Sequence, residues 1–141
     1  GPQKGGEAVV SFGTFVRTGD APIYTQIVQF IRRGLAAGTI LSGDELPSRR
    51  VLSALLGVNP NTIQKAYRIL EDGGLIQSHS GAKSYVSATP EQRERIRAQL
   101  LAEEIRRLVH TLRQSGVLKE EALALVDRLW EDDGTIEEDL S

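Results

Sequence analysis

The chain has 141 residues, of which 40% are hydrophobic and 26% are charged, and this composition excludes a disordered or fibrous protein. No apolar run reaches the roughly 18 to 20 residues that cross a bilayer, and the N-terminus lacks the basic-then-apolar pattern of a secretory signal, so we expect a cytoplasmic protein. Because the sequence has no cysteine, it excludes disulfides, thiol nucleophiles and cysteine-ligated metal centres.

The two parts of the chain carry opposite charge, although the formal net charge is only −2. Residues 12–89 contain eight Lys and Arg against five Asp and Glu, a net charge of +3. Residues 90–141 contain eight against thirteen, a net charge of −5. Because the distribution of charge matters more than its sum, a nucleic-acid partner would meet the first part.

The first residues show neither helical nor strand periodicity. The chain opens with Gly1 and Pro2, and no methionine occurs anywhere in it. We therefore expect residues 1–11, which are rich in glycine, to be a tag remnant or disordered and to lie outside the fold.

The first predicted helix begins at Pro22 and ends before Gly38. Proline suits the first helical position, and glycine suits the position after the last turn. The following segment, residues 39–47, contains glycine, aspartate and proline and is expected to be a loop. The apolar residues that form one face of this helix are Ile23, Ile27, Phe30, Ile31 and Leu35.

Two further helices are joined by a very short turn. Ser48 is a favourable N-cap for a helix that ends at Gly57. Asn59 is a second favourable N-cap, and Pro60 suits the first position of the helix after it. The apolar positions are Val51, Leu52, Leu55 and Leu56 in the first of these helices, and Ile63, Ala66, Tyr67 and Leu70 in the second.

A small β-hairpin is expected after this helix pair. Residues 75–77 and 84–86 flank a polar, glycine-containing turn. The order of helix, helix, short turn, helix and hairpin is that of a winged helix-turn-helix. We assign residues 12–88 to this mainly α domain.

Two amphipathic helices follow. Thr89 and Gln92 have the spacing of a capping box, with Pro90 at the first helical position. Because the apolar stripes are too large to leave in water, we predict that residues 89–133 form a two-helix dimerisation tail. Residues 134–141 form an acidic, frayed end. The residues expected at the dimer contact are Leu100, Leu101, Ile105, Leu108, Leu112, Leu125, Leu129 and Trp130.

The second helix of a helix-turn-helix lies in the major groove with its first residues near base edges. Here those residues include Asn61, Thr62 and Gln64, whose amide and hydroxyl groups both donate and accept hydrogen bonds. Lys65 and Arg68 are expected to meet phosphate or the flank of the groove. The alternative interpretation is a solvated helix face with no ligand.

Two other segments are candidates for DNA contact. Ser48, Arg49 and Arg50 open a helix whose exposed amides favour an anion, and they predict a phosphate clamp. The alternative is a serine cap with two solvent-facing arginines. The DNA-contacting residues expected at the hairpin tip are Ser80, Gly81 and Lys83, and neighbouring His79 belongs to the same tip. A plain loop is the alternative there.

No pattern indicates catalysis or a cofactor. His79 and His110 are the only histidines, and neither has carboxylates at metal-ligand spacing, so we expect no metal site. Nucleotide-binding glycine loops and nucleophile elbows are absent, so we expect no enzyme activity.

Three motifs in order resemble the DNA-binding domain of the GntR superfamily. They are Leu46-Pro47-Ser48-Arg49-Arg50-Val51-Leu52-Ser53, then the segment from Leu56 through Val58-Asn59-Pro60-Asn61-Thr62 to Tyr67, then Leu70 through Gly74-Leu75-Ile76. The Val-Asn-Pro-Asn-Thr segment is similar to the YtrA-like branch. The resemblance covers residues 21–86, and its motifs are specific because several occur in the right order.

The resemblance implies a homodimeric repressor that binds a palindromic operator and controls a neighbouring transporter operon. By matching position, Ser48 and Arg50 would hold phosphate, and Asn61, Thr62 and Gln64 would face the groove. The wing departs from the family pattern, because Ser80 stands where a basic residue is usual and Lys83 where a second glycine is usual.

We therefore expect a sequence-specific DNA-binding regulator with an unidentified small-molecule effector or with none. One rival hypothesis is a winged helix that binds protein and no operator. Another is a fragment of an aminotransferase-fused regulator, against which the short acidic end argues. Operator binding and protein binding are separated by replacing Arg50 and Thr62 with alanine.

Overall fold

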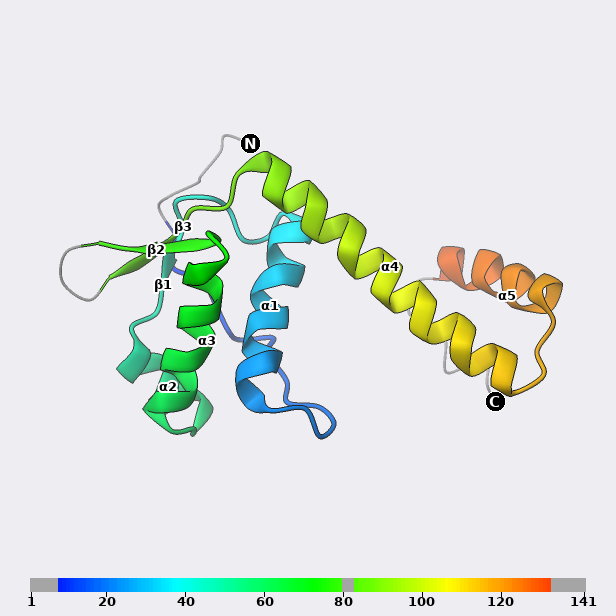
Figure 1. Cartoon of the computed structure of the whole chain (residues 1–141), viewed down its shortest axis with the longest axis horizontal. Coiled ribbons are helices and arrows are strands. Elements are labelled where there is room, and N and C mark those ends of the chain that lie inside the picture. Colours follow the sequence, from blue (N-terminus) through cyan, green and yellow to red (C-terminus); the bar gives the residue numbers. More distant parts are fainter. Residues whose placement is uncertain (1–7, 80–82, 133–141) are drawn as a thin grey trace. The chain divides into compact units, whose positions relative to one another are not determined.

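The structure, a computed structural model, describes residues 8–79 and 83–132. The chain divides into two compact units, Gly1–Leu100 and Leu101–Ser141. The elements, labelled in Figure 1, are α1 (Ile23–Ala37), β1 (Glu45–Leu46), α2 (Arg49–Leu56), α3 (Pro60–Asp72), β2 (Ile76–Ser78), β3 (Ser84–Val86), α4 (Pro90–Gln114) and α5 (Lys119–Asp132). This mainly helical winged-helix fold confirms the predicted fold class.

The helix-turn-helix begins and ends where local sequence signals place it. The Ser48 hydroxyl accepts the Val51 amide at 3.1 Å, and the Asn59 side chain accepts the Asn61 amide at 2.7 Å. Gly57 ends α2 with φ at 68°, a left-handed conformation that glycine adopts without a Cβ clash. Pro22 differs from the prediction, because it caps α1 in an extended conformation and the helix starts at Ile23.

The core of the first unit lies between α1, α3 and the small sheet. Ile27, Ile31 and Leu35 of α1 are fully buried, as are Ile63 and Tyr67 of α3. The faces named by helical spacing in the sequence are therefore the faces that pack. This packing turns the opposite face of α3 outward.

The sheet has three antiparallel strands in the order β1-β3-β2. Gln77 pairs with Tyr85 on one side, and Glu45 pairs with Tyr85 on the other. The prediction of a loop over residues 39–47 is wrong at β1. A two-residue strand carries no alternation in sequence, and its pairing with β3 is fixed by a distant segment.

The N-terminal segment also departs from the prediction. The Val10 amide donates to the Glu45 carbonyl at 2.8 Å, and the Glu45 amide donates to the Ala8 carbonyl at 2.9 Å. Val10 is only 7% exposed. Excluding residues 1–11 from the fold is therefore wrong from Ala8 onward, because the partner of this segment is β1, which the sequence does not reveal.

Helix α2 exposes part of its predicted apolar face. Val51 and Leu55 are 57% and 63% exposed, whereas Leu52 is fully buried. Helix α2 has only eight residues and contacts the core along one edge, so the core covers only part of its apolar face.

Helix α4 starts with the predicted capping box. The Thr89 amide donates to the Gln92 side chain at 2.7 Å, and the Gln92 amide donates to the Thr89 hydroxyl at 3.1 Å. Ile96 is buried, and Leu100 packs against the edge of the same core. The first unit therefore extends to Leu100, past the predicted boundary between residues 88 and 89.

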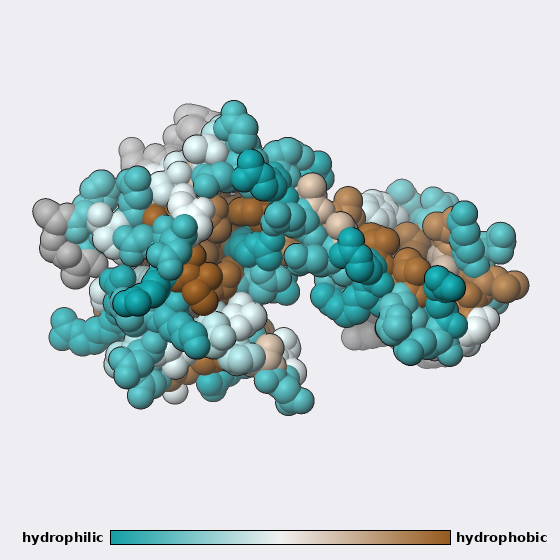
Figure 2. Space-filling view, in the orientation of Figure 1, coloured by the Kyte–Doolittle hydropathy of each residue, from teal (hydrophilic) through white to brown (hydrophobic). Residues whose placement is uncertain are grey.

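The described part of the second unit, residues 101–132, has no core of its own. No described residue from Leu101 to Asp132 is buried, and Trp130 of α5 is 80% exposed. Figure 2 shows hydrophobic side chains along the surface of α4 and α5. Among the described helices, none combines the length and hydropathy needed to span a bilayer.

Candidate nucleic-acid interface

The outward face of α3 carries the side chains predicted to meet DNA. Asn61, Lys65 and Arg68 are exposed, while Thr62 and Gln64 are half-buried at the margin of the packed face. The caps and the buried residues of α3 fix this orientation, because Ile63, Ala66, Tyr67 and Leu70 occupy the opposite face. The face offers hydrogen-bonding groups at its N-terminal end and positive charge further along.

The two arginines at the start of α2 differ in their surroundings. Arg50 is exposed and makes no ion pair within the described residues. Arg49 is half-buried, and its guanidinium carbon lies 5.1 Å from the centre of the Tyr67 ring. The sequence allows two interpretations of this segment, a phosphate clamp or a serine cap with two solvent-facing arginines. Neither describes Arg49 fully, because its side chain is partly covered and lies over a ring.

Tyr67 is held at both ends. Its ring is fully buried beneath Arg49, and its hydroxyl donates to the Pro47 carbonyl at 2.6 Å. Burial raises the pKa of the Tyr67 hydroxyl, an effect that the neighbouring Arg49 charge only partly offsets. The hydroxyl therefore stays protonated and keeps donating to Pro47.

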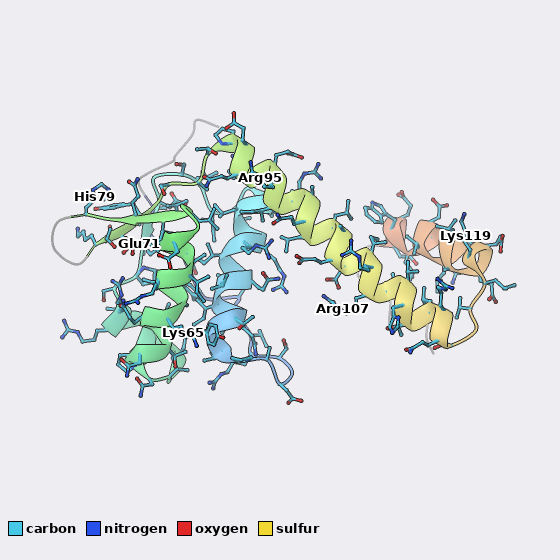
Figure 3. All side chains as sticks on the ribbon, in the orientation of Figure 1. Lys65, Glu71, His79, Arg95, Arg107 and Lys119 are labelled. Carbon is cyan, nitrogen blue, oxygen red and sulfur yellow. The ribbon has the colours of Figure 1, made fainter. Side chains whose placement is uncertain are left out.

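A second cation rests on a second tyrosine. The amine of Lys65, which Figure 3 labels on α3, lies 4.1 Å from the centre of the Tyr24 ring of α1, so this pair links the two helices. The contacts of Tyr24 and Tyr67 with these cations do not follow from the sequence. The sequence assigns Tyr67 to the core. Helical spacing places Tyr24 on the same face of α1 as Ile27 and Ile31, where it packs against the core. No sequence signal pairs either ring with a cation.

The wing supplies one described cation whose charge is already paired. Lys83 lies 3.9 Å from the Glu45 carboxylate, and its side chain is 64% exposed. The His79 ring meets the Tyr85 ring edge-on at 5.0 Å, and the His79 amide donates to the Lys83 carbonyl. Ser80 and Gly81, the predicted wing-tip contacts, lie outside the described residues.

The predicted dimer residues fall on both units. Leu100 packs on the core of the first unit, whereas Leu112 and Leu129 of the second are half-buried. The exposed members of the set are Leu101, Ile105, Leu108, Leu125 and Trp130. Within the described ranges, no three His, Asp or Glu side chains gather closely enough to hold a metal ion.

Comparison with known proteins agrees with the fold and with the motifs. Residues 23–86 match the family described as bacterial regulatory proteins, gntR family. The HTH-type transcriptional regulator YhcF of Bacillus subtilis is 33% identical over 102 residues, which cover 72% of this chain and 84% of YhcF. The HTH-type transcriptional repressor YtrA of the same organism is 42% identical over 66 residues. These residues cover 47% of this chain and 51% of YtrA, so the match spans about half of that relative.

A solved structure is similar over most of its length. The GntR family transcriptional regulator from Listeria monocytogenes superposes with a TM-score of 0.71 at 31% identity, covering 79% of this chain and 98% of that one. The relatives are named as transcriptional regulators and not as enzymes. The chain therefore belongs to the GntR family of DNA-binding transcription regulators, and it resembles the YtrA-type members among them.

Proposed function

We propose that this regulator is a cytoplasmic repressor that binds an inverted-repeat operator as a homodimer. The single observation that carries the proposal is the contrast between a polar, outward α3 face and the segment from Leu101 to Asp132, in which no described residue is buried. The first supplies a reading surface, and the second requires a partner. Residues 12–88 would bind DNA, and residues 89–133 would join two copies.

The reading residues follow from the chemistry of α3. Asn61 and Gln64 each carry an amide that can pair bidentately with adenine. The Thr62 methyl can contact the methyl group of thymine, and its hydroxyl can donate to or accept from a base edge. Arg50 and Arg68 are exposed cations without ion pairs in the described chain, so they are suited to phosphate. Ser48 caps α2 and keeps a hydroxyl hydrogen with which to donate.

The tail supports self-association through its uncovered apolar area. Exposed side chains include Leu101 at 58%, Leu118 at 64% and Trp130 at 80%. At roughly 25 cal/mol per Å², covering such side chains with a second copy of the same tail favours a dimer. A two-fold pair places its reading helices about 34 to 36 Å apart, which is one turn of DNA, and this spacing favours an inverted repeat.

The proposals that the protein represses transcription and that its target is a transporter operon rest on its similarity to YtrA-like proteins. YtrA of Bacillus subtilis is named a repressor, and the resemblance to the YtrA-like branch implies control of a transporter operon. Repression of a neighbouring transporter operon is therefore part of the proposal. A small-molecule effector, if the regulator has one, would act by raising the Kd for operator DNA.

The test is selection of bound duplexes from a random pool, with sedimentation to measure the size of the particle. We expect an inverted repeat with half-sites about one helical turn apart, a dimer, and affinity that falls with salt. Arg50→Ala and Thr62→Ala should each weaken binding while the circular dichroism spectrum stays unchanged. An unenriched pool favours the protein-binding rival, and a monomer at micromolar concentration contradicts the dimer.

A further inference from the structure

Two cations at the proposed DNA interface are each placed over a tyrosine ring. The Lys65 amine of α3 lies 4.1 Å from the Tyr24 ring centre, and the Arg49 guanidinium of α2 lies 5.1 Å from the Tyr67 ring centre. Both distances are within the range of about 6 Å at which a cation is attracted by the negative face of an aromatic ring. We call these two pairs the tyrosine seats.

We infer that Tyr24 and Tyr67 are positioning residues for DNA binding, which hold Lys65 and Arg49 in place before the phosphate backbone arrives. The inference rests on the proposed function and deepens it. Lysine and arginine lose much side-chain freedom when they bind a phosphate in one geometry. A ring that already restricts the side chain in the free protein lowers this cost, because the freedom is lost on folding instead of on binding.

A ring differs from a carboxylate as a support for a cation. Within the described residues, neither Lys65 nor Arg49 makes an ion pair, whereas Lys83 faces Glu45 at 3.9 Å. A phosphate that binds Lys83 must compete with a carboxylate of the same charge. A phosphate that binds Lys65 meets a full positive charge, because the ring attracts the cation without neutralising it.

The Tyr67 seat also links the two helices of the helix-turn-helix. Tyr67 belongs to α3, its hydroxyl bonds the Pro47 carbonyl before α2, and its ring supports Arg49 in the first turn of α2. The Arg49 Nε atom is buried without a hydrogen-bond partner among the described residues. The terminal guanidinium nitrogens therefore remain as the donors for a phosphate, and the ring holds the guanidinium that carries them.

The Tyr24 seat gives the sharper test, because Tyr24 is only half-buried and its loss should not unfold the domain. The probe is a mixed-sequence duplex of about 30 base pairs at low salt, since phosphate contacts do not depend on sequence. We expect Tyr24→Leu to weaken binding by about twofold to fivefold, the range of an exposed cation–π contact. Tyr24→Phe, which keeps the ring, should bind like the parent protein.

The salt dependence separates positioning from charge. Lys65→Met should reduce the slope of log K against log salt by about 0.9, the loss of one phosphate contact. Tyr24→Leu should leave that slope unchanged, because the lysine charge remains. In the Lys65→Met background, Tyr24→Leu should have no further effect on affinity, since the ring acts only through Lys65.

The outcomes that overturn the inference are specific. An equal loss from Tyr24→Leu with and without Lys65→Met would show a structural role for the ring. Tighter binding by Tyr24→Leu would show that the ring withholds Lys65 from DNA. Failure to select an operator sinks sequence-specific repression but leaves this test intact, whereas a parent protein that does not bind the mixed duplex at all sinks both.

Discussion

Both units of this regulator contain amphipathic helices, but the first unit buries apolar side chains in a core and the described part of the second leaves most of them exposed. In the first unit, Ile31 and Tyr67 are fully buried between α1, α3 and the sheet. In the second, from Leu101 to Asp132, no described residue is buried. An amphipathic stripe thus predicts that a face is covered, but it does not say whether the same chain or another one covers it.

The largest expected effect lies in the covered unit. Ile31→Ala should lower the free energy of unfolding by about 2 to 5 kcal/mol, because it removes buried methylene and methyl groups and leaves a cavity. Urea unfolding followed by circular dichroism measures the change. The loss should be the same at high and low protein concentration, and a loss confined to low concentration would mean that Ile31 is buried by a partner instead.

A substitution in the second unit should change dimerisation instead of the stability of a single copy. Ile105, which is 48% exposed in α4, should contact the second copy, so Ile105→Asp should weaken the dimer by about 2 kcal/mol or more. Sedimentation at graded concentrations would show monomer, and affinity for an inverted repeat would fall. Glu103→Asp, a change on the same helix that adds no charge, is the control. An unshifted dimer would place the contact elsewhere.

The Tyr67 hydroxyl tests how the first unit joins α3 to the start of α2. Tyr67→Phe keeps the buried ring but leaves the Pro47 carbonyl without its donor at 2.6 Å, so stability should fall by about 1 kcal/mol. Thermal unfolding gives the difference. The contact of Arg49 with the ring should persist, so affinity for the mixed duplex should stay within about twofold of the parent, and a much larger loss would assign the hydroxyl a direct part in binding.

Elements with local signals could be predicted from the sequence. The caps at Ser48 and Asn59 and the glycine at Gly57 each fix a helix end through one or two neighbouring residues. Strand β1 and the place of Val10 could not be predicted, because each exists only through pairing with a segment far away in the chain. Short-range patterns therefore defined the helices, and long-range pairing defined the edge of the sheet.

In the candidate site, too, local spacing predicted some features and contacts between distant residues determined others. The outward face of α3 followed from its helical spacing and its buried opposite side. The neighbouring residues Arg49 and Arg50 look equivalent in sequence, yet only Arg49 lies over a ring. Successive residues on a helix point about 100° apart, so their surroundings depend on what the helix packs against. Sequence therefore identified the basic segment but not the division of roles within it.

The smallest expected effect concerns the wing, where the charge of Lys83 is already engaged. Glu45→Gln removes the carboxylate 3.9 Å from the Lys83 amine, and affinity for the mixed duplex should rise by about twofold to threefold, within the worth of an exposed ion pair. Glu120→Gln in α5 changes net charge by the same amount, far along the chain from the wing, and it should leave the affinity nearly unchanged.

If both variants strengthen binding equally, the effect comes from net charge and the Lys83–Glu45 pair plays no part. Lys83→Met should also cost less affinity than Lys65→Met, because the phosphate must compete with Glu45 for the wing cation. Equal losses would mean that DNA displaces the carboxylate freely. The wing would then contribute as fully as α3, and a ring and a carboxylate would be equivalent supports for a DNA-binding cation.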